Sequence, residues 1–209
     1  MLLAVDIGNS ATKLGLFRGL RLVRSWRIPH GRRLRHLPKG IARTAVSSVN
    51  PAALRRILPS LPGPVLLAGR DFRVPLKGAT RATGTDRLLA AYAAFRTARG
   101  PVAVIDVGTA VTLNLVDAKG RFRGGAIFAG PETARRALAI SAAGLPLKRL
   151  SAGTRADLST GTLLAYRGFV REGLELASRL LGCKPSVFLT GGKRPDLVLY
   201  GLALCAEGL

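Results

Sequence analysis

The fold is decided by two similar stretches of sequence, LLAVDIGNSATKLGLF at residues 2–17 and VAVIDVGTAVTLNLVD at residues 102–117. In each, an apolar run leads to an aspartate, then to an apolar residue, a glycine and a small polar residue, after which apolar residues resume. With an offset of 100 residues, Asp6 aligns with Asp106, Gly8 with Gly108 and Thr12 with Thr112. Two hairpins can resemble each other by chance, but this shared order of residue types favours a duplication.

Each stretch predicts a buried strand, a tight glycine turn and a second strand that pairs back on the first. Two facing turns of this kind present backbone N–H groups to phosphates, while their carboxylates can hold a cation. A single Asp-x-Gly turn is weak evidence, because glycine also serves simply to make a turn. The pair of turns, with a third glycine turn at residues 190–192, favours a nucleotide cleft.

The remaining elements follow from hydrophobic spacing and from Gly and Pro positions. We expect third strands at 20–28 and 122–128, a last strand at 187–189, loops at 58–64 and 151–157, and helices at 51–58, 85–99, 131–143, about 160–181 and from about 195. In the helix from Thr85, which is the expected N-cap, Leu88, Leu89, Tyr92 and Phe95 have the spacing of a core-facing side.

Composition limits the class of protein. The chain of 209 residues is long enough for a substantial core, and no apolar run approaches the roughly 20 residues that span a bilayer. The first residues reach Asp6 without a basic leader, which predicts a cytoplasmic protein rather than a signal peptide. Cys183 and Cys205 are far apart and in no metal-binding spacing, so we expect two buried free thiols.

The net charge of +22 comes from 33 Lys and Arg against 11 Asp and Glu. Such a balance favours binding to polyanions by electrostatics alone. The densest basic stretch, residues 18–39, contains no recognisable nucleic-acid-binding motif, so we expect solvated basic surfaces and no specific nucleic-acid partner.

Further motifs resemble one known family across essentially the whole chain. They are DIGNSATK (6–13), SSVNP (47–51), GTDR (84–87), DVGTAVT (106–112), GGAIFAG (124–130), GLP (144–146), TGG (190–192) and DLVLYGL (196–202). In order and spacing they resemble the type III pantothenate kinases of bacteria, which belong to the actin-like ATPase and sugar kinase superfamily. The most specific feature is GTDR at a helix start, 20 residues before DVGTA.

The resemblance implies an α/β fold, the duplicated ribonuclease H-like (actin-like ATPase) fold, with two similar halves around a nucleotide cleft. The expected N-terminal half is residues 1–99 plus about 195–209, and the C-terminal half is residues 100–194. It also implies transfer of the ATP γ-phosphate to the primary hydroxyl of pantothenate, in coenzyme A biosynthesis. The family builds its substrate pocket across a two-fold interface, which implies a homodimer.

Site residues follow from the same resemblance. Asp86 is the implied general base, Asp106 the ligand of a monovalent cation (K⁺ or NH₄⁺), and Asp6 the carboxylate near Mg²⁺. The implied ATP contacts are Asp6, Ile7, Gly8, Asn9, Ser10, Ala11, Thr12, Lys13 and Thr109. The implied substrate contacts are Gly84, Thr85, Asp86, Arg87 and, from a family threonine pattern, Thr160 or Thr162. Arg87 suits the pantothenate carboxylate because its guanidinium can bind it in a bidentate fork.

The chain departs from the family pattern at several places. Lys77 and Thr80 stand where members usually have Tyr and Pro, and Ala129 replaces a usual Pro. The TGG segment also runs almost directly into DLVL, where relatives have an additional strand and helix.

Besides nucleic-acid binding through the charge of +22 and a different acyl acceptor within the same superfamily, two further hypotheses remain at the sequence level. One is a catalytically weak accessory or regulatory relative that binds nucleotide without recognising pantothenate. The other concerns Asp86 alone, which could be a helix-terminal carboxylate paired with Arg87 instead of a base.

Overall fold

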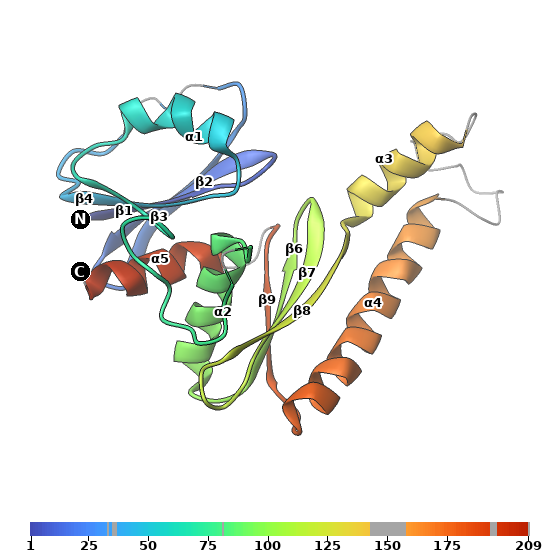
Figure 1. Ribbon diagram of the computed structural model, residues 1–209. Coiled ribbons are helices and arrows are strands. Elements are labelled where there is room, and N and C mark those ends of the chain that lie inside the picture. The colour runs from blue at the N-terminus through green and yellow to red at the C-terminus, as the bar shows by residue number, and fades with distance from the viewer. Residues whose placement is uncertain (33, 35–36, 81, 143–157, 193–195, 209) are drawn as a thin grey trace.

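The first half of the molecule is built on a five-stranded mixed sheet (Figure 1). The predicted hairpin forms β1 (Leu2–Ile7) and β2 (Ala11–Arg18), and β3 (Arg21–Pro29) pairs antiparallel with β2. On the other side of β1 lie two parallel strands, β4 (Arg43–Ser48) and β5 (Val65–Leu67). They are connected by α1 (Pro51–Ile57) and the 3₁₀ turn η1 (Leu58–Ser60). The computed structural model describes the whole chain except residues 33, 35–36, 81, 143–157, 193–195 and 209.

The second half repeats this plan in a four-stranded sheet. Its strands are β6 (Val102–Val107), β7 (Ala110–Val116), β8 (Phe122–Ala129) and β9 (Ser186–Thr190), in the order β8-β7-β6-β9. The order and directions match β3-β2-β1-β4 of the first sheet. Both sheets also carry a bulge at the equivalent point, one between Leu16 and Phe17 and the other between Leu115 and Val116. The predicted duplicated fold is therefore confirmed.

The two hairpins differ by one residue in their turns. The first turn is closed by a hydrogen bond from Gly8 N to Ala11 O (3.1 Å), and the second by one from Gly108 N to Ala110 O (2.9 Å). Asp6 therefore pairs across its hairpin with Lys13, whereas Asp106 pairs with Thr112. The alignment of Thr12 with Thr112 from sequence is wrong by one position, because the second turn is shorter.

The helices form layers around the two sheets. Helices α2 (Thr85–Ala98) and α5 (Leu197–Glu207) lie between the sheets, as Figure 1 shows, and share one apolar core with the inner faces of both. Helix α1 covers the other face of the first sheet, and α4 (Leu158–Leu181) covers the outer face of the second. Helix α3 (Pro131–Ser141) packs on α4. Because α2 lies between the sheets, its first turn lies at the boundary between the halves.

The contact between α2 and α5 depends on Gly201. A Cβ atom at this position would lie 2.3 Å from the carbonyl oxygen of Leu89, so only glycine lets the two helices approach this closely.

Strand β9 lacks the cover that its counterpart has. Leu189 pairs with Ile105 as Val46 pairs with Val5, so Leu189 and Val46 occupy equivalent places. Val46 is fully buried, whereas Leu189 is 43% exposed and Val187 is 44% exposed. In the described part of the second half, no helix and strand corresponding to α1 and β5 follow β9, and the chain enters α5 at Leu197.

Most predicted elements are found with shifted ends. Strands β4 and β5 were not predicted, and η1 lies inside an expected loop. The N-cap of α2 is Gly84 and not Thr85, and it makes no side-chain capping bond. Cys205 is buried as expected, but Cys183 is exposed, which corrects that prediction.

Some predictions fall outside the described residues: the segment GLP, the loop 151–157, the end of the helix expected to reach 143, and the helix start at 195. Among the described residues, no helix is both long and apolar enough to cross a membrane.

Candidate active site

Asp6 and Lys13 form the centre of the site, on the paired strands β1 and β2. The side chain of Asp6 is 7% exposed, and its Oδ2 lies 3.6 Å from Lys13 Nζ. Lys13 Nζ lies closer, at 2.8 Å, to Oδ2 of Asp196 in front of α5. Burial raises the pKa of Asp6 to about 7, and the attraction of Lys13 only partly opposes this rise. Burial alone would lower the pKa of Lys13, but Asp196 and Asp6 outweigh it and raise the pKa to about 12.

The second oxygen of Asp6 is a candidate cation ligand. Oδ1 is buried and has no hydrogen-bond partner among the described residues. A buried carboxylate oxygen without a partner is costly unless something binds it. No three acidic, histidine or cysteine side chains of the described residues gather into a metal centre. A cation at Asp6 would thus complete its shell with water and ligand oxygens, as Mg²⁺ does when it is bound with phosphates.

Asp86 lies in the first turn of α2. A residue of strand β4 links this turn to Asp6. Ser47 of β4 pairs with Asp6 in the sheet, and its Oγ is 2.9 Å from Oγ1 of Thr85. The Oδ1 of Asp86 accepts a hydrogen bond from Arg87 N at 2.8 Å. A Cβ atom on Gly84 would lie 2.5 Å from this same oxygen, so the glycine makes room for the carboxylate. The segments SSVNP and GTDR are therefore held together.

Asp106 brings the second half to the same place. Burial raises its pKa, Lys13 lowers it, and Asp196 and Asp86 raise it. The third glycine turn packs directly on it, since a Cβ atom at Gly191, which has φ +87°, would lie 2.5 Å from Asp106 Oδ1. The two hairpin turns meet as well, with Ser10 Oγ 2.8 Å from Thr109 Oγ1. The carboxylates of both halves thus act on one another electrostatically.

Arg87 is held by a neutral partner. Its Nε donates to Oδ1 of Asn114 at 2.6 Å, and Asn114, which is fully buried, donates from Nδ2 to Thr112 Oγ1 at 2.9 Å. The guanidinium also lies over the ring of Phe122, 5.8 Å from its centroid. Among the described residues Arg87 forms no ion pair within 4.0 Å, so its charge remains available for an anionic ligand.

The structure brings together most of the predicted site residues but not all of them. Asp6, Lys13, Asp86 and Asp106 influence one another electrostatically, and Gly8, Asn9, Ser10 and Ala11 belong to the first turn. Ile7 and Thr12 are buried, so they reach the site through their backbone at most. Thr160 and Thr162 lie in the first turns of α4, and in Figure 1 that end of α4 lies far from α2.

Two residues of the site were missed from sequence. Asp196 holds Lys13, and Asn114 holds Arg87. The aspartate before the apolar run LVLYGL was a signal for a helix cap, and its Oδ1 does accept hydrogen bonds from Val198 N and Leu199 N. The sequence around Asn114 reads as an ordinary strand and gave no signal.

Comparisons with known proteins agree with this arrangement. A family model described as type III pantothenate kinase matches residues 2–175. Proteins named type III pantothenate kinase from Parafrankia sp. (strain EAN1pec) and Frankia alni are 34% and 33% identical, covering 95% and 99% of this chain and 88% and 99% of their own lengths. The alignment with the protein of that name from Thermomicrobium roseum, at 30% identity, covers 99% of this chain and 97% of the relative. It spans 252 positions against the 209 residues here, so at least 43 positions have no counterpart in this chain.

Solved structures agree on the fold. A Campylobacter jejuni protein assigned to the Baf family of transcriptional activators has a TM-score of 0.58 at 15% identity, with 99% of this chain and 98% of that chain covered. The Listeria monocytogenes protein Lmo2764, assigned as an N-acetylmannosamine kinase, has a TM-score of 0.57 at 13% identity, with the same coverage. These likenesses establish the actin-like ATPase fold. The family model and the three relatives show that this chain belongs to the type III pantothenate kinase family.

Proposed function

We propose that the protein is an ATP-dependent pantothenate kinase, which phosphorylates the primary hydroxyl of pantothenate in coenzyme A biosynthesis. The observation that carries the proposal is the convergence of Asp6, Asp86 and Asp106 with Lys13 at the boundary between two similar halves. Phosphoryl transfer needs positioning and charge neutralisation more than covalent catalysis, and these groups supply both.

In this proposal the triphosphate lies between the two hairpin turns. The backbone amides of the turns, together with Ser10, Lys13 and Thr109, are the phosphate contacts, and the other predicted ATP residues support them. Asp6, with its free buried oxygen, would hold Mg²⁺. Asp106 would hold the monovalent cation, K⁺ or NH₄⁺. When bound, these cations neutralise the charge of the phosphates during transfer.

The acceptor end is formed by the start of α2. Asp86 would accept the proton of the attacking hydroxyl, and Arg87 would bind the pantothenate carboxylate in its fork. Gly84 and Thr85 would line this end. Asn114 acts by positioning Arg87, because it holds Nε and leaves the terminal nitrogens of the guanidinium for the ligand.

An activity assay tests the proposal. We expect the purified protein to form phosphopantothenate from pantothenate, ATP and Mg²⁺, to do so faster with K⁺ than without it, and to lose this activity in Asp86→Ala. A rate no higher in the wild type than in Asp86→Ala would refute the kinase. If ATP still binds in that case, the accessory relative is the better interpretation, and the departures at Lys77 and Thr80 would explain the lost acceptor.

We also propose a cytoplasmic homodimer. Exposed apolar residues gather on the outer helices of the second half: Leu138 and Ile140 of α3, and Leu163 and Leu164 of α4. Exposed apolar side chains that cluster on neighbouring helices mark an interaction surface, and Ile140 is the most exposed of the four, at 85%. A second copy seated there would cover the α4 turns that carry Thr160 and Thr162, the two candidates for one substrate contact, which lie far from α2 in one chain.

Sedimentation measures this assembly. The wild type should sediment as a dimer, and Ile140→Glu combined with Leu164→Glu as a monomer. Val23→Glu, at an exposed apolar residue of the first half, is the control and should remain dimeric. A monomeric wild type would refute the dimer without affecting the kinase proposal.

A further inference from the structure

A basic feature extends from Arg87 to Arg121 and Arg123, two arginines that have no role in the proposed reaction. An open pocket of about 550 Å³ is lined by Arg87, Arg121, Arg123, Thr80, Thr83 and the glycine pair 124–125, with Gly78 and Phe122. We call it the basic pocket. Its volume is in the range of small-molecule sites. Its lining residues include three arginines and no acidic residue.

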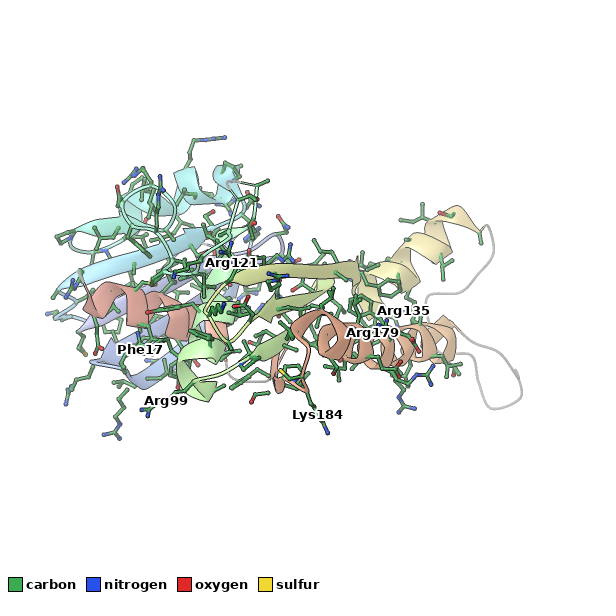
Figure 2. The ribbon with its side chains drawn as sticks, turned by 60° about the horizontal axis from the view of Figure 1, so that its bottom comes forward. Phe17, Arg99, Arg121, Arg135, Arg179 and Lys184 are labelled. Carbon is green, nitrogen blue, oxygen red and sulfur yellow. The ribbon has the colours of Figure 1, made fainter. Side chains whose placement is uncertain are left out.

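The pocket is assembled from both halves. The loop before α2 is joined to the start of β8 by two backbone hydrogen bonds, from Lys77 N to Gly120 O (3.0 Å) and from Phe122 N to Lys77 O (2.7 Å). Gly78 makes room for the stem of Arg121, since a Cβ atom there would lie 2.8 Å from Arg121 Cγ. Figure 2 shows Arg121 at the junction between the halves. The loop thus places Thr80 and Thr83 in one pocket with Arg121, which precedes β8, and Arg123 of β8.

The bulge in β8 places Arg123. Phe122 pairs with Val116 and Gly124 with Leu115, so Arg123 is the additional residue of the bulged strand. Bulges of this kind turn a side chain out of the regular alternation of a strand. The equivalent bulge of the first half carries Val23, so the fold itself does not require an arginine here. Asp117 Oδ2 lies 3.8 Å from Arg123 and neutralises part of its charge, which leaves the pocket positive.

We propose that the basic pocket binds a small organic anion with two separated anionic groups, a carboxylate at Arg87 and a phosphate at Arg121 and Arg123. A single carboxylate is satisfied by one guanidinium fork, whereas a phosphate dianion takes hydrogen bonds from two. The hydroxyls of Thr80 and Thr83 are hydrogen-bonded to each other at 3.1 Å, which leaves one hydroxyl hydrogen as a further donor. A ligand of this class would compete with the acceptor for Arg87 and so inhibit phosphorylation; that consequence rests on the proposed function, but the binding does not.

Calorimetric titration with two matched probes tests the pocket. The probes are 3-phosphoglycerate, which has a carboxylate and a phosphate, and glycerate, which has the carboxylate alone; saturating ADP and Mg²⁺ occupy the hairpin turns. The wild type should bind 3-phosphoglycerate at least roughly tenfold more tightly than glycerate, as expected for charge-assisted hydrogen bonds to one phosphate. The double variant Arg121→Gln/Arg123→Gln should lose this difference.

The matched control is Arg21→Gln/Arg27→Gln, which removes two exposed charges from β3 and should keep the difference. Equal loss in both double variants would show a general charge effect and overturn the proposal. A difference that persists in Arg121→Gln/Arg123→Gln, or the absence of 3-phosphoglycerate binding to the wild type, would also overturn it. Because binding heat requires no phosphoryl transfer, failure here and failure of the kinase assay are separate results.

Discussion

The carboxyl group of Asp6 is buried beside Lys13, and burial raises its pKa from 3.8 to about 7. The folded state therefore holds this proton more tightly than the unfolded chain. Its contribution to stability is complete below about pH 4 and is lost as the pH rises through about 7. Ionised Asp6 is accordingly a strained state without its cation, and binding of a cation should improve as the pH rises over the same range.

Replacing Asp6 by Asn removes this titration. Between about pH 5 and pH 8, we expect the free energy of unfolding of the wild type to fall by about 2–3 kcal/mol relative to Asp6→Asn. Urea unfolding of both proteins without divalent cations measures the difference. Parallel pH curves would mean that the pKa of Asp6 is not raised.

Gly84 is needed for the position of the Asp86 carboxylate and not for the conformation of the backbone. Its φ of −55° is open to any residue, but a Cβ atom would lie 2.5 Å from the Asp86 carboxylate. Gly84→Ala should lower kcat at least roughly tenfold, because the base is displaced, and cost no more than about 1 kcal/mol of stability. Gly168→Ala, in a part of α4 with open space around the glycine, is the control. It should leave kcat unchanged and stabilise by up to about 1 kcal/mol.

At the scale of elements, Asp196 joins the start of α5 to the phosphate hairpin. Its Oδ1 caps α5 and its Oδ2 binds Lys13. Asn can keep the cap but not the charge, whereas Ala keeps neither. We expect Asp196→Ala to cost about 1 kcal/mol more than Asp196→Asn in denaturant unfolding, and both to be less stable than the wild type. Equal losses in the two variants would show that the cap contributes nothing.

The sequence predicts those elements whose signal is local. The hairpins were predictable because apolar runs, aspartates and glycines recur in phase. Strand β4 was missed because Arg43–Ser48 reads RTAVSS, a short polar segment that is buried only because it lies between two other strands. The shorter turn after Asp106 could not be predicted, because the spacing of residues in the sequence does not show it. Only the pairing of the two strands does.

The residues of the site likewise divide into those with a local sequence signal and those without one. Asp6, Asp86 and Asp106 were predictable from motifs, whereas the partners Asp196 and Asn114 depend on contacts between distant parts of the chain. The pairing of Asp196 with Lys13 exists only because α5 returns from the C-terminus to lie between the sheets.

At the scale of the whole molecule, the halves are joined through α2 and α5. We propose that residues 1–99 with about 195–209, and residues 100–194, are the two units that move around the nucleotide. Gly201 and Leu89 both belong to the first of these units, and Leu89 lies in the core that this unit shares with the second. Gly201→Ala should destabilise by about 2–3 kcal/mol through overpacking, seen as a lower thermal midpoint. A midpoint equal to that of Gly168→Ala would contradict this tight packing.

The uncovered face of β9 has a practical consequence for handling the protein. Strand β9 is the edge of its sheet, and an edge strand with exposed Val187 and Leu189 can add to the same strand of another molecule and begin aggregation. The net charge of +22 opposes this by mutual repulsion, which salt screens. Solutions should therefore stay clear at low ionic strength and become turbid as sodium chloride is added. Light scattering of the wild type and of Leu189→Lys would detect this, and the variant should remain clear to higher salt.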